Sequence, residues 1–230
     1  MITLAIDSTA KAASAALIKD NTVLAEYTQN TGHTHSETML PMAEAVMKAA
    51  GVTPDTVDLF AISAGPGSFT GVRIGISIIK GICFGKDKPI AAISSMDSLA
   101  RNLEGFGGVV CPVMDARRSQ VYTAIYKDGI RQTEDMLIPC AELKEMLSAY
   151  DCPIYFTGDG YDLAKKLIDL PGVVDTPVRL RLQNAVSVAL EGIRCYNENK
   201  CIFTDTEVMP IYLRASQAER ERLERIQNNE

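Results

Sequence analysis

The 230-residue chain contains no tryptophan, two histidines and few aromatic residues, which make up 6% of the sequence. Histidine is the side chain most often used to bind transition metals and to transfer protons near neutral pH. His33 and His35 are two residues apart and therefore cannot lie on one face of a helix. The sequence thus argues against a histidine-built metal pair and against a catalytic histidine.

Long apolar runs and an excess of basic residues are also missing. The longest apolar stretch, Ile74 to Phe84, is broken by Lys80 and is much shorter than the about 20 residues that span a bilayer. The first residues lack the basic region and the cleavage site of a signal peptide. The formal net charge of −6 disfavours an unaided binding surface for nucleic acid or for an anionic membrane. We therefore expect a cytoplasmic protein that does not bind membranes.

Six cysteines are present, but none belongs to a C-x-x-C motif and no histidine lies nearby to complete a zinc site. In a chain without an export signal, such cysteines are expected to be reduced and mostly buried. The cysteine pattern therefore predicts neither a disulfide framework nor a bound metal.

A glycine-rich stretch from Gly65 to Gly75, GPGSFTGVRIG, is the most informative part of the chain. It joins an apolar run predicted as a buried strand (residues 57–63) to one predicted as a helix (residues 72–84). Gly65 and Gly67 can adopt backbone angles that a Cβ atom forbids, so the chain can turn sharply between the two elements.

A loop of this kind can hold an anion, because backbone N–H groups point outward at the positive end of the following helix. Ser68 or Thr70 is placed to cap that helix. Gly65, Gly67, Ser68 and Thr70 are therefore a candidate anion or nucleotide loop. A plain strand-to-helix turn that binds nothing is the alternative, since the stretch matches neither common phosphate-binding motif.

Three carboxylates follow predicted strands or lie in turns. Asp7 ends the first strand, Asp115 follows the strand at residues 109–114, and Asp159 lies between two glycines. A phosphoryl-transfer enzyme with two lobes needs such carboxylates to hold magnesium and activate a nucleophile. Asp7 also fits a turn in which the side chain bonds its own backbone, which is the favoured interpretation.

The predicted elements form two similar halves. Each half opens with hairpin strands and continues with helix–strand units, and the glycines of residues 105–108 separate the halves. This order predicts an α/β protein with two RNase H-like or actin-like halves, mixed sheets flanked by helices and a cleft between them. The expected domains are residues 1–105 and 106–214, followed by a charged, solvated tail at residues 215–230.

The helix predicted at residues 34–50 carries an unusual number of methionines. Thr34 and Glu37 form a capping-box pattern at its start, and Pro41 suggests a bend or a later start. Its apolar stripe serves either as core filler or as an adaptable surface for a partner.

Six motifs occur in a fixed order along the chain. They are Ile6-Asp7-Ser8-Thr9, His35-Ser36-Glu37 with Leu40-Pro41, residues 65–75, Asp115-Ala116-Arg117-Arg118, Gly158-Asp159-Gly160 and Pro210-Ile211-Tyr212-Leu213-Arg214. Together these motifs resemble the bacterial TsaB family, also called YeaZ. The resemblance runs from residue 6 to residue 214, and the glycine loop on its own is shared with the larger TsaD family.

The resemblance implies a two-lobed actin-like fold and a non-catalytic partner of TsaD. In this pathway TsaD transfers a threonylcarbamoyl group to the adenosine beside the tRNA anticodon, and the ATPase TsaE joins the pair. TsaD carries two metal-binding histidines on a helix that corresponds here to residues 93–99, where Ser95 and Leu99 stand. Leucine cannot bind a metal, so the resemblance implies an inactive relative of TsaD. ATP, ADP and metal are expected on TsaD and TsaE, with no cofactor bound by this chain alone and tRNA reached through the complex.

The resemblance also implies that the first two long helices dock to TsaD, or to a second copy of the chain when TsaD is absent. Part of the methionine stripe would then be exposed. Gly71, Gly75 and Gly81 would allow either a close helix–helix approach or close packing on the sheet. The implied interface residues are Met39, Leu40, Met42, Ala43, Val46 and Met47 on the first helix, and Gly71, Val72, Gly75 and Ile79 on the second.

Two other functions remain open at this point. One is an ATP-dependent enzyme of the actin-like superfamily, either a small-molecule kinase or, less well supported by the two histidines, a metallopeptidase. The other is a nucleotide-sensing module that uses the glycine loop.

Overall fold

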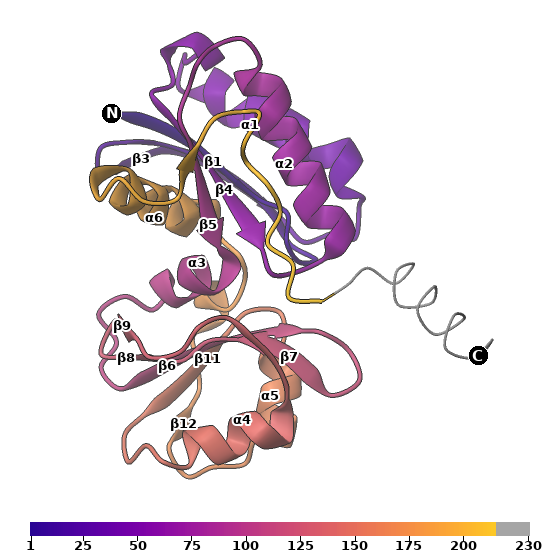
Figure 1. Cartoon of the computed structure of the whole chain (residues 1–230), viewed down its shortest axis with the longest axis vertical. Helices are drawn as coiled ribbons and strands as arrows, with labels where there is room; N and C mark the ends of the chain where they lie inside the picture. The colour runs from indigo at the N-terminus through magenta and orange to yellow at the C-terminus, as the bar shows by residue number, and fades with distance from the viewer. Residues whose placement is uncertain (215–230) are drawn as a thin grey trace, which may run out of the picture.

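A mixed six-stranded sheet, in the order β13-β5-β4-β1-β2-β3, forms the first lobe of the computed structural model, which describes residues 1–214 (Figure 1). The tail predicted at residues 215–230 lies outside the described residues. Strands β1, β4 and β5 are parallel, whereas β2, β3 and β13 run antiparallel to their neighbours. The strands are β1 (Ile2–Asp7), β2 (Ala13–Lys19), β3 (Thr22–Gln29), β4 (Leu59–Gly65), β5 (Ile90–Ser94) and β13 (Ile202–Phe203).

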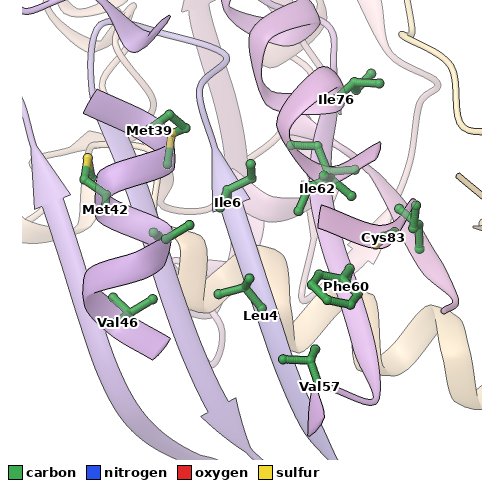
Figure 2. Packing of buried hydrophobic residues seen from close by; sticks show 14 of the residues in the cluster. Leu4, Ile6, Met39, Met42, Val46, Val57, Phe60, Ile62, Ile76 and Cys83 are labelled. Atoms are coloured by element: carbon green, nitrogen blue, oxygen red, sulfur yellow. The ribbon is translucent and has the colours of Figure 1, made fainter. Parts of the chain in front are cut away.

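Successive side chains along each strand point to opposite faces of the first sheet, so apolar residues lie on both faces. Leu4, Ile6 and Phe60 face α1 (His35–Ala49) and α2 (Phe69–Cys83), as Figure 2 shows for the core on that side. Ala5 and Ala61 face α6 (Ala185–Asn197) on the opposite side. This period of two is the one expected of strands buried on both faces.

The second lobe has a sheet in the order β10-β7-β6-β11-β12, in which the short strand β8 also pairs with β6, and β9 pairs with β8. Val109, Cys111 and Val113 face α4 (Cys140–Leu147) and α5 (Tyr161–Leu167) in its core. The strands are β6 (Val109–Asp115), β7 (Gln120–Thr123), β8 (Tyr126–Lys127), β9 (Ile130–Arg131), β10 (Met136–Pro139), β11 (Ile154–Thr157) and β12 (Val173–Val174). Two short 3₁₀ turns, η1 (Pro54–Thr56) and η2 (Val178–Leu180), complete the described elements.

The short helix α3 (Ser95–Arg101) lies between the lobes (Figure 1). Met96 and Leu99 of this helix share an apolar cluster with Ala10 of the first lobe and with Val110 and Met114 of the second. The lobes are therefore joined by a small core of their own as well as by the crossing chain.

The predicted domain boundary at residue 214 is wrong, because the chain returns to the first lobe well before it. Helix α6 covers the first sheet, and β13 pairs with β5 at its edge. The return is tight, since a Cβ added at Gly192 would lie 2.7 Å from the Cβ of Ala61. The second lobe thus ends before Ala185.

Two local expectations for α1 are also corrected. The helix runs without interruption through Pro41, whose missing N–H falls on the exposed side. The Thr34 side chain makes no capping hydrogen bond; instead the Thr38 hydroxyl donates to the Thr34 carbonyl at 3.1 Å. Gly51 follows the helix with a φ of +66°, as expected of a left-handed terminus. Within residues 1–214, no helix has the length and apolar character needed to cross a membrane.

Candidate functional site

The methionine stripe of α1 faces the protein core, so the expectation that it is partly exposed is wrong. Met39 is fully buried and Met42 is 3% exposed, and both lie over the first sheet in Figure 2. Ala43, Val46 and Met47 are buried with them. The physical reason is that β1, β2 and β3 need an apolar cover, which this stripe supplies.

Four predicted interface residues of α2 face inward too. Val72 and Ile79 are buried, and a Cβ at Gly71 would collide with the carbonyl oxygen of Ser8. A Cβ at Gly75 would lie 2.5 Å from Ser8 Oγ. Close packing against the helix's own lobe, one of the two readings of these glycines, is therefore confirmed for both.

An outer face remains on both helices and is available to a partner. Leu40 of α1 is 41% exposed, whereas Phe84, directly after α2, is 80% exposed. We call a set of exposed residues on these helices the outer face of α1 and α2. They are Leu40, Pro41, Glu44, Ala45 and Lys48 of α1, Arg73, Ser77 and Gly81 of α2, and Phe84, which directly follows α2.

The glycine loop starts α2 as predicted, and contacts within the chain account for its glycines. Ser68 caps the helix, since its Oγ accepts a hydrogen bond from Gly71 N at 3.2 Å. A Cβ at Gly67 would lie 2.5 Å from the Thr9 carbonyl oxygen. Gly65 has a φ of +112° and lies against the carbonyl of Ile211. The anion-binding role of Gly65, Gly67, Ser68 and Thr70 stays a prediction.

A cavity of about 520 Å³ lies between the lobes beside this loop. Its walls carry basic, acidic and aromatic side chains from both lobes and from the last described residues. They include Lys11, Phe69, Asp115, Arg117, Tyr122, Asp159, Tyr212 and Arg214. The expected cleft therefore exists, and the α2 N-terminus opens onto it with Thr70.

The three candidate carboxylates do not converge in this cavity. Asp7 is fully buried, and its Oδ1 accepts from Thr9 N at 2.9 Å and from the Thr9 hydroxyl at 2.7 Å. This is the turn predicted for Asp7, and burial raises the pKa of its carboxyl. Asp115 and Asp159 both line the cavity.

Asp159 differs electrostatically from an ordinary surface carboxylate. Burial, and secondarily the charge of Asp115, raises its pKa to about 6. Its Oδ1 is buried without a hydrogen-bond partner in the described part of the chain. Perturbed carboxylates of this kind gather at functional sites, although structural causes produce them as well.

The position implied for a metal pair lies in α3. Ser95 and Leu99 are fully buried, and Ser95 Oγ lies 2.9 Å from Ser63 Oγ. His35 is elsewhere, with its Nε2 2.6 Å from the Ala10 carbonyl oxygen. Among residues 1–214, no group of three or more histidine, cysteine, aspartate or glutamate side chains is arranged to hold a metal ion.

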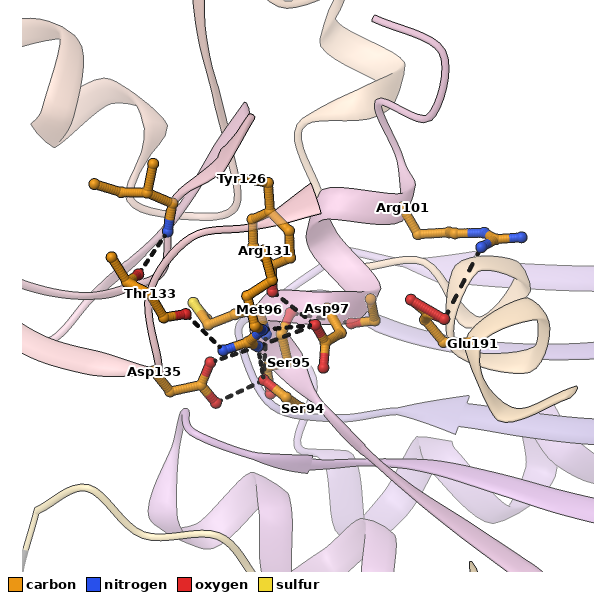
Figure 3. A network of polar contacts seen from close by, with 12 residues as sticks. Ser94, Ser95, Met96, Asp97, Arg101, Tyr126, Arg131, Thr133, Asp135 and Glu191 are labelled. Carbon is orange, nitrogen blue, oxygen red and sulfur yellow. Dashed lines mark hydrogen bonds and ion pairs between the residues drawn. The ribbon is translucent and has the colours of Figure 1, made fainter. Parts of the chain in front are cut away.

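One polar network between the lobes was not predicted from the sequence. Arg131 contacts Asp97 of α3 and Asp135 of the second lobe, and the Ser94 hydroxyl donates to Asp135 at 2.6 Å (Figure 3). Tyr126 donates to Asp97 at 2.7 Å. No sequence motif marks these residues, because they come together only when the lobes are assembled.

Comparisons with known proteins agree with this architecture. Residues 22–195 match the model of the TsaD family, described as tRNA N6-adenosine threonylcarbamoyltransferase. The Bacillus subtilis tRNA threonylcarbamoyladenosine biosynthesis protein TsaB is 36% identical over 173 residues, covering 74% of this chain and 76% of the relative. The Escherichia coli protein of the same name is 30% identical over 219 residues, covering 92% and 94%.

The solved structures point in the same direction. A Pseudomonas aeruginosa protein described as similar to peptidase YEAZ superposes with a TM-score of 0.80 at 25% identity, covering 93% of this chain and 99% of that one. The predicted fold class, two actin-like halves with mixed sheets and flanking helices, is confirmed. The chain therefore belongs to the TsaB (YeaZ) family.

Proposed function

We propose that this chain is a non-catalytic partner of a TsaD-type transferase in the formation of threonylcarbamoyladenosine next to the tRNA anticodon. The relatives named above are biosynthesis proteins of this modification, and the transferase family model matches most of the chain. The net charge of −6 supports a role in which tRNA is reached through the complex.

The observation that carries the proposal is the identity of two side chains in α3. At the helix where TsaD-like enzymes hold a metal between two histidines, this chain has Ser95 and Leu99. Leu99 cannot bind a metal, and its full burial leaves no room for a ligand to approach. A scaffold of this kind contributes to a reaction by docking, with metal and nucleotide bound by the TsaD and TsaE partners.

The docking surface that we propose is the outer face of α1 and α2, which includes Leu40. Leu40 is the one apolar residue of the original α1 set whose side chain is exposed. In the absence of TsaD, the same face would pair with a second copy of the chain.

The test is a binding measurement between the full chain and TsaD from the same organism. Leu40→Asp should weaken binding at least about a hundredfold, because docking would bury an unpaired charge. Leu24→Asp is the matched control, since Leu24 is also 41% exposed but lies on β3, away from this face. Equal binding by the two variants would contradict the assignment of the surface.

A second candidate function is an ATP-dependent reaction in the cleft, favoured by the presence of Asp115 and Asp159 beside the glycine loop. We expect negligible ATP hydrolysis by the purified chain and turnover after TsaD and TsaE are added. Steady hydrolysis by the chain alone, lost in Asp159→Asn, would favour this second function instead.

A further inference from the structure

The last described segment, residues 208–214, runs along α2 and reaches the second lobe (Figure 1); we call it the strap. Val208 anchors it in the first core. Ile211 N donates to the Ala64 carbonyl at 2.8 Å, so the strap lies directly on the end of β4. The strap therefore covers the start of the glycine loop, where a ligand would otherwise approach.

An aromatic stack fixes the middle of the strap to α2. The ring of Tyr212 lies 4.6 Å from that of Phe69, with 23° between the two planes. The Tyr212 hydroxyl accepts a hydrogen bond from Arg73 Nε at 2.7 Å, and the Arg73 guanidinium lies 3.9 Å from the Phe69 ring centre. This part of the strap thus moves with the first lobe.

Arg214 joins the end of the strap to the second lobe. Its Nη1 donates to the Ala116 carbonyl at 2.9 Å, and its Nη2 donates to Gln120 Oε1 at 2.7 Å. Ala116 begins the turn between β6 and β7, and Gln120 is the first residue of β7 after that turn. In that turn Arg117, Arg118 and Ser119 all have φ between +54° and +64°, a backbone region that side chains disfavour unless their surroundings hold it.

The two lobes are consequently joined on both sides of the cleft. On one side lie α3 and the Arg131 network of Figure 3, and on the other lies the single forked contact of Arg214. Beyond Val208 the strap is partly exposed, since Met209 is 67% exposed and Tyr212 is 41% exposed. Its hydrogen bonds to the second lobe both come from Arg214, and a link made of so few contacts can open locally.

We infer that the strap is an intramolecular latch: Arg214 holds the cleft at a fixed opening, and its release lets the second lobe rotate about α3. The inference is independent of the proposed partner. If a protein does dock on the outer face of α1 and α2, it meets Arg73, whose side chain also contacts the stacked rings of Phe69 and Tyr212.

The test compares the full chain with Arg214→Ala by amide hydrogen exchange and by small-angle X-ray scattering. In the variant, peptides that cover residues 208–214 and 115–120 should exchange about tenfold faster, because two hydrogen bonds to a charged group are lost. The radius of gyration should also increase. Arg117→Ala is the matched control, because Arg117 lines the same cavity and its side chain has no bonded partner within residues 1–214.

Each outcome decides the inference. Faster exchange with unchanged scattering would overturn it, because the contact would then stabilise the strap without setting the angle between the lobes. Unchanged exchange would overturn it as well. If Arg214→Ala fails to fold, Gln120→Ala removes one of the two bonds from the other lobe and should speed exchange of the strap about threefold. No change in that variant would refute the latch.

Discussion

Arg131 reaches Asp97 across the junction of the lobes, with Nη2 3.0 Å and Nε 3.1 Å from the same Oδ1 atom. The Tyr126 hydroxyl donates to that oxygen too, and burial together with Asp97 raises the pKa of Tyr126. Asp97 therefore accepts three hydrogen bonds from the second lobe while it belongs to α3. The network orients the second lobe against the helix on which the chain crosses between the lobes.

Replacing Arg131 should destabilise the fold. Arg131→Ala leaves Asp97 and Asp135 facing each other without their shared cation, which we expect to lower the free energy of unfolding by about 2–4 kcal/mol. The measurement is denaturant unfolding followed by circular dichroism. Arg179→Ala, an exposed arginine in η2, serves as the control and should change stability by less than about 0.5 kcal/mol. Equal effects would mean that the network contributes nothing specific.

Alanine substitutions at two glycines of α2 should change the stability of the protein in opposite directions. Gly71→Ala should destabilise the protein by about 2–3 kcal/mol, since its Cβ would meet the Ser8 carbonyl and force the helix away from the lobe. Gly81→Ala should stabilise it by about 0.5–1 kcal/mol, because nothing lies within 4 Å of the added Cβ and alanine favours the helix. Thermal unfolding of both variants provides the comparison, and the same sign for both would contradict the packing of Gly71.

Substitutions of one buried and one exposed residue of α1 should distinguish the face that stabilises the fold from the face proposed for docking. Met42→Ala should lower the free energy of unfolding by about 2–4 kcal/mol, because the methionine is 3% exposed in the first core. Leu40→Ala should cost less than about 1 kcal/mol. Denaturant unfolding measures both changes. A larger loss for Leu40→Ala would show that the assignment of buried and exposed faces is wrong.

Much of the fold follows from local patterns in the sequence. The continuous apolar runs of β1 and β4 predict buried strands, and the glycine loop marks the start of α2 with Ser68 or Thr70 as the predicted cap. Asp7 forms the turn expected of it, because that interaction involves Thr9 two residues away. Local chemistry is sufficient in these cases.

The remaining features depend on contacts between distant parts of the chain. An apolar stripe such as that of Met39 and Met42 shows which face of a helix avoids water, but not whether its own sheet or a partner covers that face. Position 71 requires a glycine because a Cβ there would collide with the carbonyl oxygen of Ser8, which lies 63 residues earlier in the chain. The return of α6 to the first sheet and the contact of Arg214 with Ala116 leave no local pattern, so neither was predicted.

The buried carboxyl of Asp159 should make stability depend on pH. Its pKa is about 6 in the folded chain and close to 3.8 when unfolded, so between these values the folded state holds a proton that the unfolded state releases. The free energy of unfolding therefore falls as pH rises from about 4 to about 6, and above that range the whole decrease caused by Asp159 is present. The asparagine of Asp159→Asn is uncharged at every pH in this range. The variant should therefore have a free energy of unfolding on the order of 2 kcal/mol higher than that of the natural chain at pH 7, and almost the same value at pH 4.

The measurement is denaturant unfolding of both proteins between pH 4 and pH 8. Asp7 also has a raised pKa, but it is present in both chains and its contribution cancels in the difference. Asp55→Asn provides a control of opposite sign, because Lys86 lowers the pKa of Asp55 and this variant should lose stability at neutral pH rather than gain it. A difference for Asp159→Asn that stays constant across the pH range would mean that the carboxyl is not held in its protonated form by burial, and that the cleft is more open to water than the structure indicates.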